Sequence, residues 1–272
     1  MPVEQFPFIK GDLAEADFGE MPVPTFNMWE IQGKEDIVIR EESDRVKNAH
    51  GQTKKDLGRR IEIYKDGKKL FHELRDKYNI NVIPFGYIVG KADPDDSPQV
   101  FSVTKKIFGK NIRDISRGEL DDQENKKFSK EADQMISSLA EYAKDKYANY
   151  GNILNDVFHY HQYVFGKKTG DKENKIYLVD IEPLYIKMEN IPPGKVGFRD
   201  NQVFNAVQSL QNFISCVEQL THMRLISARK KLDDLFNYVL SSCLPGSVQN
   251  ISVAKNMWEK TTRYNEEVGL YK

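Results

Sequence analysis

The sequence is poor in several features that would narrow its function at once. It holds two cysteines, Cys216 and Cys243, whose positions match no metal-binding spacing, so we expect two free thiols in a reducing cytoplasm. No apolar run is long enough to cross a bilayer, which predicts no transmembrane helix. The N-terminal residues lack a basic start followed by an apolar stretch, so we expect no secretory signal.

Neither sign of charge is in excess. The 272 residues include 40 Lys and Arg and 41 Asp and Glu, for a net charge of −1. This balance favours neither nucleic acid nor an anionic membrane as a partner, and it gives no hint of the charge of a substrate. No internal repeat and no apolar seam stands out, so we expect a monomer with one large domain or two lobes.

The N-terminal part predicts a small sheet with one helix. Short β-prone runs are separated by turn-forming residues, and the first two predict a hairpin around the sequence GKE. These runs are residues 26–32, 36–42, 80–90 and 99–104. Residues 53–78 have the apolar spacing of a helix, although Gly58 and Gly67 weaken that prediction.

The rest of the chain predicts helices around a second hairpin. Apolar residues recur at helical spacing in four segments. These segments run from Phe128 to Ala143, from Val203 to Val217, from Leu232 to Val239 and from Ile251 to Trp258. Between the first two, residues 161–166 and 175–180 are β-prone and are joined by the polar turn KKTGDKEN, which predicts a hairpin. Loops are expected at 148–157 and 190–198.

One stretch ends a β-prone run with a carboxylate. In IYLVDIEP, residues 176–183, Asp180 closes the run and Glu182 and Pro183 follow. A carboxylate fixed at a strand end is a hard oxygen ligand of the kind that Mg²⁺ on nucleotide phosphates needs. An aspartate that merely ends a strand before a proline turn explains the same residues equally well.

This stretch, together with the order of elements, resembles the protein-kinase-like fold. The similarity is to the small-molecule branch, the aminoglycoside and choline kinases, whose metal-binding strand ends in Asp-Phe-Glu or Asp-Trp-Glu. It covers about residues 25–190 as an order of elements. The resemblance implies an α+β fold of two lobes, with a sheet lobe at 1–103, a hinge at 104–112 and a helical lobe at 113–272. ATP and Mg²⁺ would lie between the lobes, with Asp180 and Glu182 as metal ligands.

The loop before the second hairpin fits the catalytic loop of this fold in two registers. Its sequence, NYGNILNDVFHYHQYVFG, spans residues 149–166. The first register matches Gly151 and Asn152 to a GNIL motif, which puts Tyr147 where the catalytic aspartate belongs. The second register makes Asp156 the catalytic aspartate.

We prefer the second register on topology, because it places the hairpin strand directly before the turn that leads to Asp180. His161 or Gln162 then replaces the metal-binding asparagine of the family. Gln162 keeps an amide oxygen, and His161 is a softer ligand or a proton relay. The alternative is that His159 and His161 are alternate residues of a strand without any ligand role.

The run DIVIREE resembles the strand that carries the phosphate-binding lysine, and Arg40 takes the place of that lysine. A guanidinium can hold α- and β-phosphate oxygens in a fork. Its partner glutamate on the following helix would be Glu62 or Glu73, and the spacing does not choose between them. Alternatively, Arg40 is simply a solvated residue at a strand end.

The run QVFSVTKKIFGKNIRDI, residues 99–115, resembles the hinge strand and linker. Adenine would bind backbone near 104–107, with Thr104 and Lys105 as the first candidates. The glycine-rich phosphate loop of kinases is missing, because Gly11 and Gly19 do not form its pattern. No Ala-Pro-Glu segment follows Asp180, which argues against a protein kinase.

Three functions follow from these patterns. The first is an ATP- and Mg²⁺-dependent phosphotransferase of the small-molecule-kinase type, acting on an unknown small molecule or protein. The second is a catalytically inactive pseudokinase that serves as a binding or scaffold module. The third is an α+β protein of other purpose, in which LVDIEP is a structural strand end.

Two further features have structural explanations. We expect the cluster SARKK, residues 227–231, to lie on a solvated helix face, and we expect His222 to be a capping or packing residue.

Overall fold

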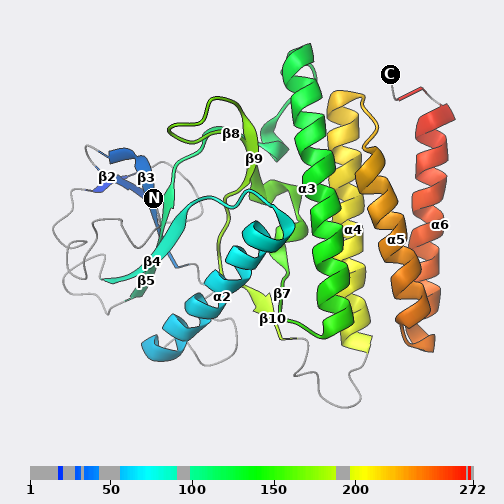
Figure 1. Cartoon of the computed structure of the whole chain (residues 1–272), viewed down its shortest axis with the longest axis horizontal. Coiled ribbons are helices and arrows are strands. Elements are labelled where there is room, and N and C mark those ends of the chain that lie inside the picture. The colour runs from blue at the N-terminus through cyan, green and yellow to red at the C-terminus, as the bar shows by residue number, and fades with distance from the viewer. Residues whose placement is uncertain are drawn as a thin grey trace.

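A computed structural model describes residues 18–20, 28–31, 34–42, 56–90, 99–187, 197–267 and 269–270 (Figure 1). It combines small antiparallel sheets with long helices, as the sequence predicts. Gly11, residues 53–55 of the expected helix and residues 190–196 of the expected loop lie outside the described residues.

The N-terminal sheet has five antiparallel strands in the order β1-β2-β3-β5-β4. They are β1 (Phe18–Glu20), β2 (Met28–Ile31), β3 (Lys34–Glu41), β4 (Phe85–Gly90) and β5 (Gln99–Lys105). The hairpin expected around GKE is confirmed as β2 and β3. The run 80–90 becomes a strand only from Phe85, after Pro84, whose missing N–H keeps it out of ladder positions.

Helix α2 (Leu57–Tyr78) connects β3 to β4 and confirms the expected helix. Asp56 caps its start by accepting a hydrogen bond from the backbone of Arg59, and Asn79 ends it in the left-handed conformation. Gly67, which weakens the sequence prediction, has a packing role. A Cβ atom there would lie 2.3 Å from Cβ of Pro183, so only glycine lets α2 approach the segment after Asp180 this closely.

A second sheet holds the expected hairpin and one strand that the sequence analysis missed. Its order is β6 (Phe108–Asn111), β8 (Tyr163–Lys167) and β9 (Lys175–Leu178). Gly109 of β6 lies opposite Gly166 of β8, and a Cβ on either residue would come within 2.4 Å of a carbonyl oxygen of the other strand. The expected linker at 104–112 therefore contains the end of β5 and all of β6.

Short elements surround this hairpin. They are β7 (Ile153–Leu154), which pairs with β10 (Tyr185–Ile186), and the 3₁₀ helices η3 (Ile112–Asp114), η4 (Asp156–Phe158) and η5 (Tyr160–Gln162). β9 also forms a parallel bridge, Val82 with Leu178, to the segment that leads into β4. Both backbone groups of Leu178 bond to that segment, so β9 is joined directly to the connection between α2 and the first sheet.

Four long helices form the C-terminal part and lie side by side in Figure 1. They are α3 (Asp122–Asn149), α4 (Gly197–Thr221), α5 (Ile226–Ser242) and α6 (Pro245–Glu267). The first three apolar segments seen in the sequence are confirmed as buried helix faces. In the fourth, Ile251, Ala254 and Trp258 are buried, but Met257 is exposed (64%), which corrects its expected place on the apolar face. α5 lacks a side-chain cap of its own. Instead, Asp133 of α3 accepts hydrogen bonds from the backbone N–H groups of Ser227 (3.3 Å) and Ala228 (2.8 Å).

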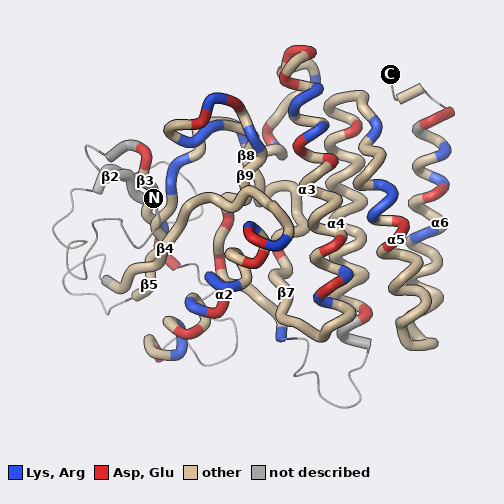
Figure 2. The backbone as a smooth tube through the Cα atoms, in the orientation of Figure 1, with Lys and Arg blue, Asp and Glu red and all other residues tan. Residues whose placement is uncertain are grey.

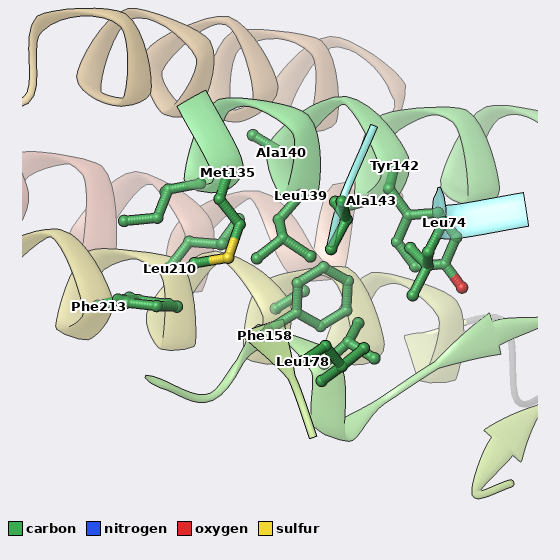
Figure 3. Packing of buried hydrophobic residues seen from close by; sticks show 14 of the residues in the cluster. Leu74, Met135, Leu139, Ala140, Tyr142, Ala143, Phe158, Leu178, Leu210 and Phe213 are labelled. Carbon is green, nitrogen blue, oxygen red and sulfur yellow. The ribbon is translucent and has the colours of Figure 1, made fainter. Parts of the chain in front are cut away.

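One continuous hydrophobic core joins α2 and the hairpin to the bundle. Figure 3 shows Leu74 of α2 beside Tyr142 and Ala143 of α3, and Leu178 of β9 beside Phe158, all within one cluster that also includes Leu210 of α4. Tyr64 and Val100 belong to a smaller separate cluster between α2 and the first sheet. The core of the helical part thus extends to α2 and to the segment that leads into β4, and the division at 104–112 stays a prediction.

A buried polar cluster ties the last three helices together, and it corrects one expectation. Arg229 does not lie on a solvated face, because its guanidinium donates to both carboxylate oxygens of Glu218 (2.5 and 2.6 Å). It also donates to Thr262 of α6 and lies 4.5 Å from the ring of Trp258. The register explains this, since Arg229 follows Leu225 by four residues and precedes Leu232 by three.

Acidic and basic residues alternate along α2 and α3 in Figure 2 and do not gather by sign there. Many of them form exposed pairs, such as Lys65 with Glu62 and Lys69 with Asp66. None of the helices in the described ranges is both long and apolar enough to span a membrane.

Candidate functional site

The centre of the candidate site is an ion cluster between β3 and the segment after β9. Arg40 lies near the end of β3, and one of its terminal nitrogens is 2.7 Å from Oδ1 of Asp180 and 3.2 Å from Oε1 of Glu182. The three side chains are mostly buried, with 16%, 27% and 12% of their surface exposed. Burial opposes the charge of Arg40, but the two carboxylates outweigh it and raise the pKa of the guanidinium.

The segment that carries Asp180 is held from three sides. Strand β9 ends at Leu178, two residues earlier than the sequence predicts, and the N–H of Val179 donates to the carbonyl of Gln162 (3.0 Å). Tyr87 of β4 donates its hydroxyl hydrogen to the carbonyl of Ile181 (2.9 Å). Because Pro183 also packs against Gly67 of α2, the position of the Asp180 carboxylate depends on the first sheet, α2 and η5 together.

Neither expected glutamate pairs with Arg40. Glu62 is exposed and bonds to Lys65 (2.8 Å), and Glu73 bonds to Lys146 of α3 (2.5 Å). The ion pair between the sheet and α2 is instead formed by Glu42, which follows β3, and Arg60 of the helix, and both side chains are buried. The charges of this pair are reversed relative to the expected arrangement, in which the strand carries the cation and the helix the glutamate.

Adenine was expected to bind the backbone near 104–107, but the N–H groups of Lys105 and Lys106 already donate hydrogen bonds within the protein. The N–H of Lys105 donates to the carbonyl of Pro84 (2.9 Å), and the N–H of Lys106 donates to the carbonyl of Asp36 (2.8 Å). Thr104 lies within the sheet, between Val38 and Phe85. The ammonium of Lys105 forms an ion pair with Asp36. These backbone donors therefore do not face a nucleotide.

In the catalytic-type loop, Asp156 comes before the first strand of the hairpin, which is the order of elements that the preferred register expects. Asp156 begins η4, η5 ends at Gln162, and β8 begins at the next residue. Gln162 is buried, and its carbonyl accepts from Val179, so its backbone lies beside the segment that carries Asp180. Asn152 precedes β7, which pairs with β10. The role of Asp156 stays a prediction.

The histidine pair differs from both expectations. His159 and His161 do not alternate on a strand, because His161 lies within η5 and His159 directly before it. Their rings stack at 5.2 Å with an angle of 16°. The carbonyl of His161 accepts from the side chain of Asn111 (2.6 Å), which fixes the loop to β6. His161 is exposed. Among the residues that the structure describes, it belongs to no group of three side chains that could hold a metal ion.

The described residues do not fit the Mg²⁺ that the resemblance implies. In the ranges that the structure describes, no three His, Cys, Asp or Glu side chains could hold a metal ion together. Arg40 occupies the approach to Asp180 at hydrogen-bond distance, whereas Mg²⁺ needs oxygen ligands at about 2.0–2.1 Å in octahedral geometry. Of the expected metal ligands, Asp180 and Glu182 share one contact, and it is the guanidinium of Arg40.

Two tyrosines near the cluster were missed by the sequence analysis. The rings of Tyr64 of α2 and Tyr87 of β4 meet edge to face at 4.4 Å. Burial raises the pKa of both phenols, and nearby Glu42 raises that of Tyr64 further. Both side chains therefore stay neutral at physiological pH. The placement of Phe85 and Tyr87 two residues apart on β4 is a sequence signal for Tyr87, whereas Tyr64 lies on helix α2 and that spacing does not concern it.

Comparison with known proteins adds little to this geometry. No protein-family model matches the chain, and no curated protein matches it. Among solved structures, it is similar to a Rio2 kinase–ADP/Mg²⁺–phosphoaspartate complex from Chaetomium thermophilum, with 12% identity over 91% of this chain and 73% of that chain. The TM-score of 0.38 is too low for the similarity to support an inference, so we interpret the site from its own residues.

Proposed function

We propose that the chain is a non-catalytic binding module with a kinase-like layout, in which Arg40 takes the place of a metal ion. The observation that carries the proposal is the 2.7 Å contact between the Arg40 guanidinium and the Asp180 carboxylate. A cation already neutralises the carboxylate that would hold Mg²⁺. Displacing it would leave a mostly buried guanidinium beside the incoming metal, which is electrostatically unfavourable.

The charge of the cluster supports the same conclusion. Arg40 contributes one positive charge and Asp180 and Glu182 contribute two negative charges, so the three groups together are negative. The charge of these three groups alone would repel a nucleotide phosphate unless a metal bridged them. The pair of Glu42 and Arg60 is neutral as a unit.

The alternative, a phosphotransferase, is favoured by one observation. The backbone bond between Val179 and Gln162 brings the expected catalytic loop next to the Asp180 segment. An active enzyme would then need Arg40 to leave Asp180 when a metal–nucleotide complex binds. The cytoplasmic location and the monomeric state expected from the sequence remain predictions, and the sequence names no substrate.

Thermal unfolding with ATP, with Mg²⁺ and with both tests the proposal. A ligand at 100 times its dissociation constant would stabilise the native state by about 2.7 kcal/mol, a clear shift in Tm. We expect no shift from the ATP–Mg²⁺ combination and no ATP turnover. A shift that requires Mg²⁺ and disappears in Asp180→Asn, but persists in the surface control Asp114→Asn, would overturn the proposal in favour of the phosphotransferase.

A further inference from the structure

A cavity of about 730 Å³ is bordered by Tyr160 of the catalytic-type loop, and it shares no lining residue with the Arg40 cluster. Its walls come from four segments: the turn before α3, η5, one face of α4 and the C-terminal residues. Cavities of roughly 300–1,000 Å³ are typical of small-molecule sites. The size therefore fits an organic ligand.

The turn that brings Arg117 to the cavity is well defined. Gly118 has a φ of +79°, which a turn of this kind requires at its third residue and which glycine adopts without strain. The N–H of Glu119 donates to the carbonyl of Ser116 (3.1 Å), and the Glu119 side chain accepts from the N–H of Ser116 (2.9 Å). An ion pair of Glu119 with Lys110 ties the turn to β6.

The opposite wall is also fixed. Leu270 is held by a hydrogen bond between its carbonyl and Nδ1 of His222, at the C-terminal end of α4 (3.1 Å). Tyr160 of η5 packs against Phe213 of α4, with ring centroids 6.1 Å apart. The cavity is thus formed by parts of the fold that other contacts already hold in place.

The lining has a consistent chemistry. Asn212, Ser215 and Gln219 recur every three or four residues on one face of α4, opposite the face that packs in the core. With Arg117, they offer hydrogen-bonding groups that no other described residue uses. The rings of Tyr160 and Tyr264 offer apolar faces, and none of the lining residues that the structure describes is acidic.

We propose that this cavity binds a small organic anion that carries a planar ring. Arg117 would bind the carboxylate or phosphate, because a guanidinium forms paired hydrogen bonds with either group. The tyrosine rings would contact the planar part, and the amides of Asn212 and Gln219 would bind its polar edge. The inference does not depend on the proposed function, since none of the residues of the Arg40 cluster takes part.

Cys216 provides a reporter, because its thiol lines the cavity, whereas Cys243 does not and serves as an internal control. The intact protein is treated with 5,5′-dithiobis(2-nitrobenzoate), an aromatic carboxylate, or with the uncharged 4,4′-dithiodipyridine. In each case the thiolate attacks one sulfur of the reagent and releases the other half as a thiolate. Burial raises the pKa of Cys216, so the reaction is run at mildly alkaline pH, and labelling of each cysteine is followed by peptide mass spectrometry.

The first measurement compares Arg117→Gln with Arg113→Gln. Arg113 is exposed on the same segment, pairs with Asp114 and does not line the cavity. We expect Arg117→Gln to slow labelling of Cys216 by the anionic reagent about tenfold, with little effect on the uncharged reagent or on Cys243. Equal rates in both variants, or equal slowing by both reagents, would overturn the proposal.

The second measurement identifies the anionic group. Benzoate and AMP, each at millimolar concentration, are tested for protection of Cys216 against the uncharged reagent. Protection by benzoate alone indicates a carboxylate ligand, protection by AMP alone indicates a phosphate ligand, and either must weaken in Arg117→Gln. Protection by neither compound, or protection that persists unchanged in Arg117→Gln, would contradict a site for aromatic anions.

Discussion

Arg229 and Arg40 both form ion pairs with carboxylates that are mostly shielded from solvent, but their surroundings differ. Arg229 in the helical bundle donates from all three of its guanidinium nitrogens, and its partner Glu218 also accepts from the backbone of Leu225. Arg40 meets two carboxylates at the edge of the first sheet, and 27% of the Asp180 side chain stays exposed. The first arrangement is fully buried and satisfied within the bundle, whereas the second is partly exposed, and its guanidinium nitrogen is shared between two carboxylates.

Removing the buried pair of Arg229 and Glu218 should have the largest effect on stability. Glu218→Gln leaves the charge of Arg229 uncompensated in the bundle core, and Arg229→Met leaves the Glu218 carboxylate without its donors. We expect either variant to lose about 3–5 kcal/mol in urea unfolding. Lys231→Met is the matched control, because Lys231 pairs with Glu141 at the surface and should lose less than about 1 kcal/mol. If Lys231→Met lost as much stability as Glu218→Gln or Arg229→Met, the buried pair would contribute no more to folding than the exposed pair.

Disturbing the close packing of α2 against the segment after Asp180 should have the next largest effect on stability. Gly67→Ala places a Cβ against Pro183, and we expect a net loss of about 1–3 kcal/mol despite the better helix propensity of alanine. Gly58→Ala in the same helix meets only a side-chain oxygen at 3.4 Å and should be neutral or stabilising. Chemical denaturation of the two variants measures the difference, and a stabilising Gly67→Ala would show that the segment is not held tightly.

Removal of Arg40 should uncover a cation site. Arg40→Met leaves Asp180 and Glu182 close together without their guanidinium, at a cost of about 1–2 kcal/mol because the cluster is partly exposed. We expect the variant to regain stability on addition of millimolar Ca²⁺ or Mg²⁺, while the wild type does not respond. Thermal unfolding with and without each cation measures this, and Arg59→Met at an exposed position of α2 is the control. An unresponsive variant would mean that the two carboxylates cannot share a cation.

The smallest effect concerns acid stability of the β8–β9 hairpin. Burial alone would raise the pKa of Asp171, but hydrogen bonds from Lys168 and Tyr177 outweigh it and hold the pKa at about 2. The carboxylate therefore stabilises the fold above its unfolded pKa of about 3.9, and this contribution disappears as the pH falls towards 2.

Asp171→Asn should remove about 1 kcal/mol at neutral pH, after allowance for screening by water, and should leave less stability to lose between pH 4 and about 2. Urea unfolding at a series of pH values measures both quantities. Asp114→Asn, at an exposed carboxylate, is the control. An unchanged acid profile in Asp171→Asn would show that the hydrogen bonds of Asp171 do not contribute to folding.

Periodic apolar patterns predicted most of the fold. The stripe from Phe128 to Ala143 became the buried face of α3, because helical spacing is a local property of the chain. Strand β6 was missed because its residues are mostly exposed and its pairing with β8 depends on residues more than fifty positions away. Local sequence carries no information about such a partner.

The site was harder to predict for the same reason. Asp180 and Glu182 were predicted as metal ligands, but both contact Arg40. Arg40 and Asp180 are 140 residues apart, and no spacing rule connects them. Glu62 and Glu73 were plausible only because they are on the following helix. Arg229 was different, since its place in the apolar register of α5 could have shown from the sequence that it is buried.

The capping of α5 by Asp133 links secondary structure to tertiary structure. The first backbone N–H groups of α5 find their acceptor on α3, so the start of α5 is complete only when the two helices are docked. An isolated α5 segment would fray at this end. In the folded protein, hydrogen exchange at the amides of Ser227 and Ala228 therefore reports on the docking of α3, and a probe of one helix end measures the integrity of the whole bundle.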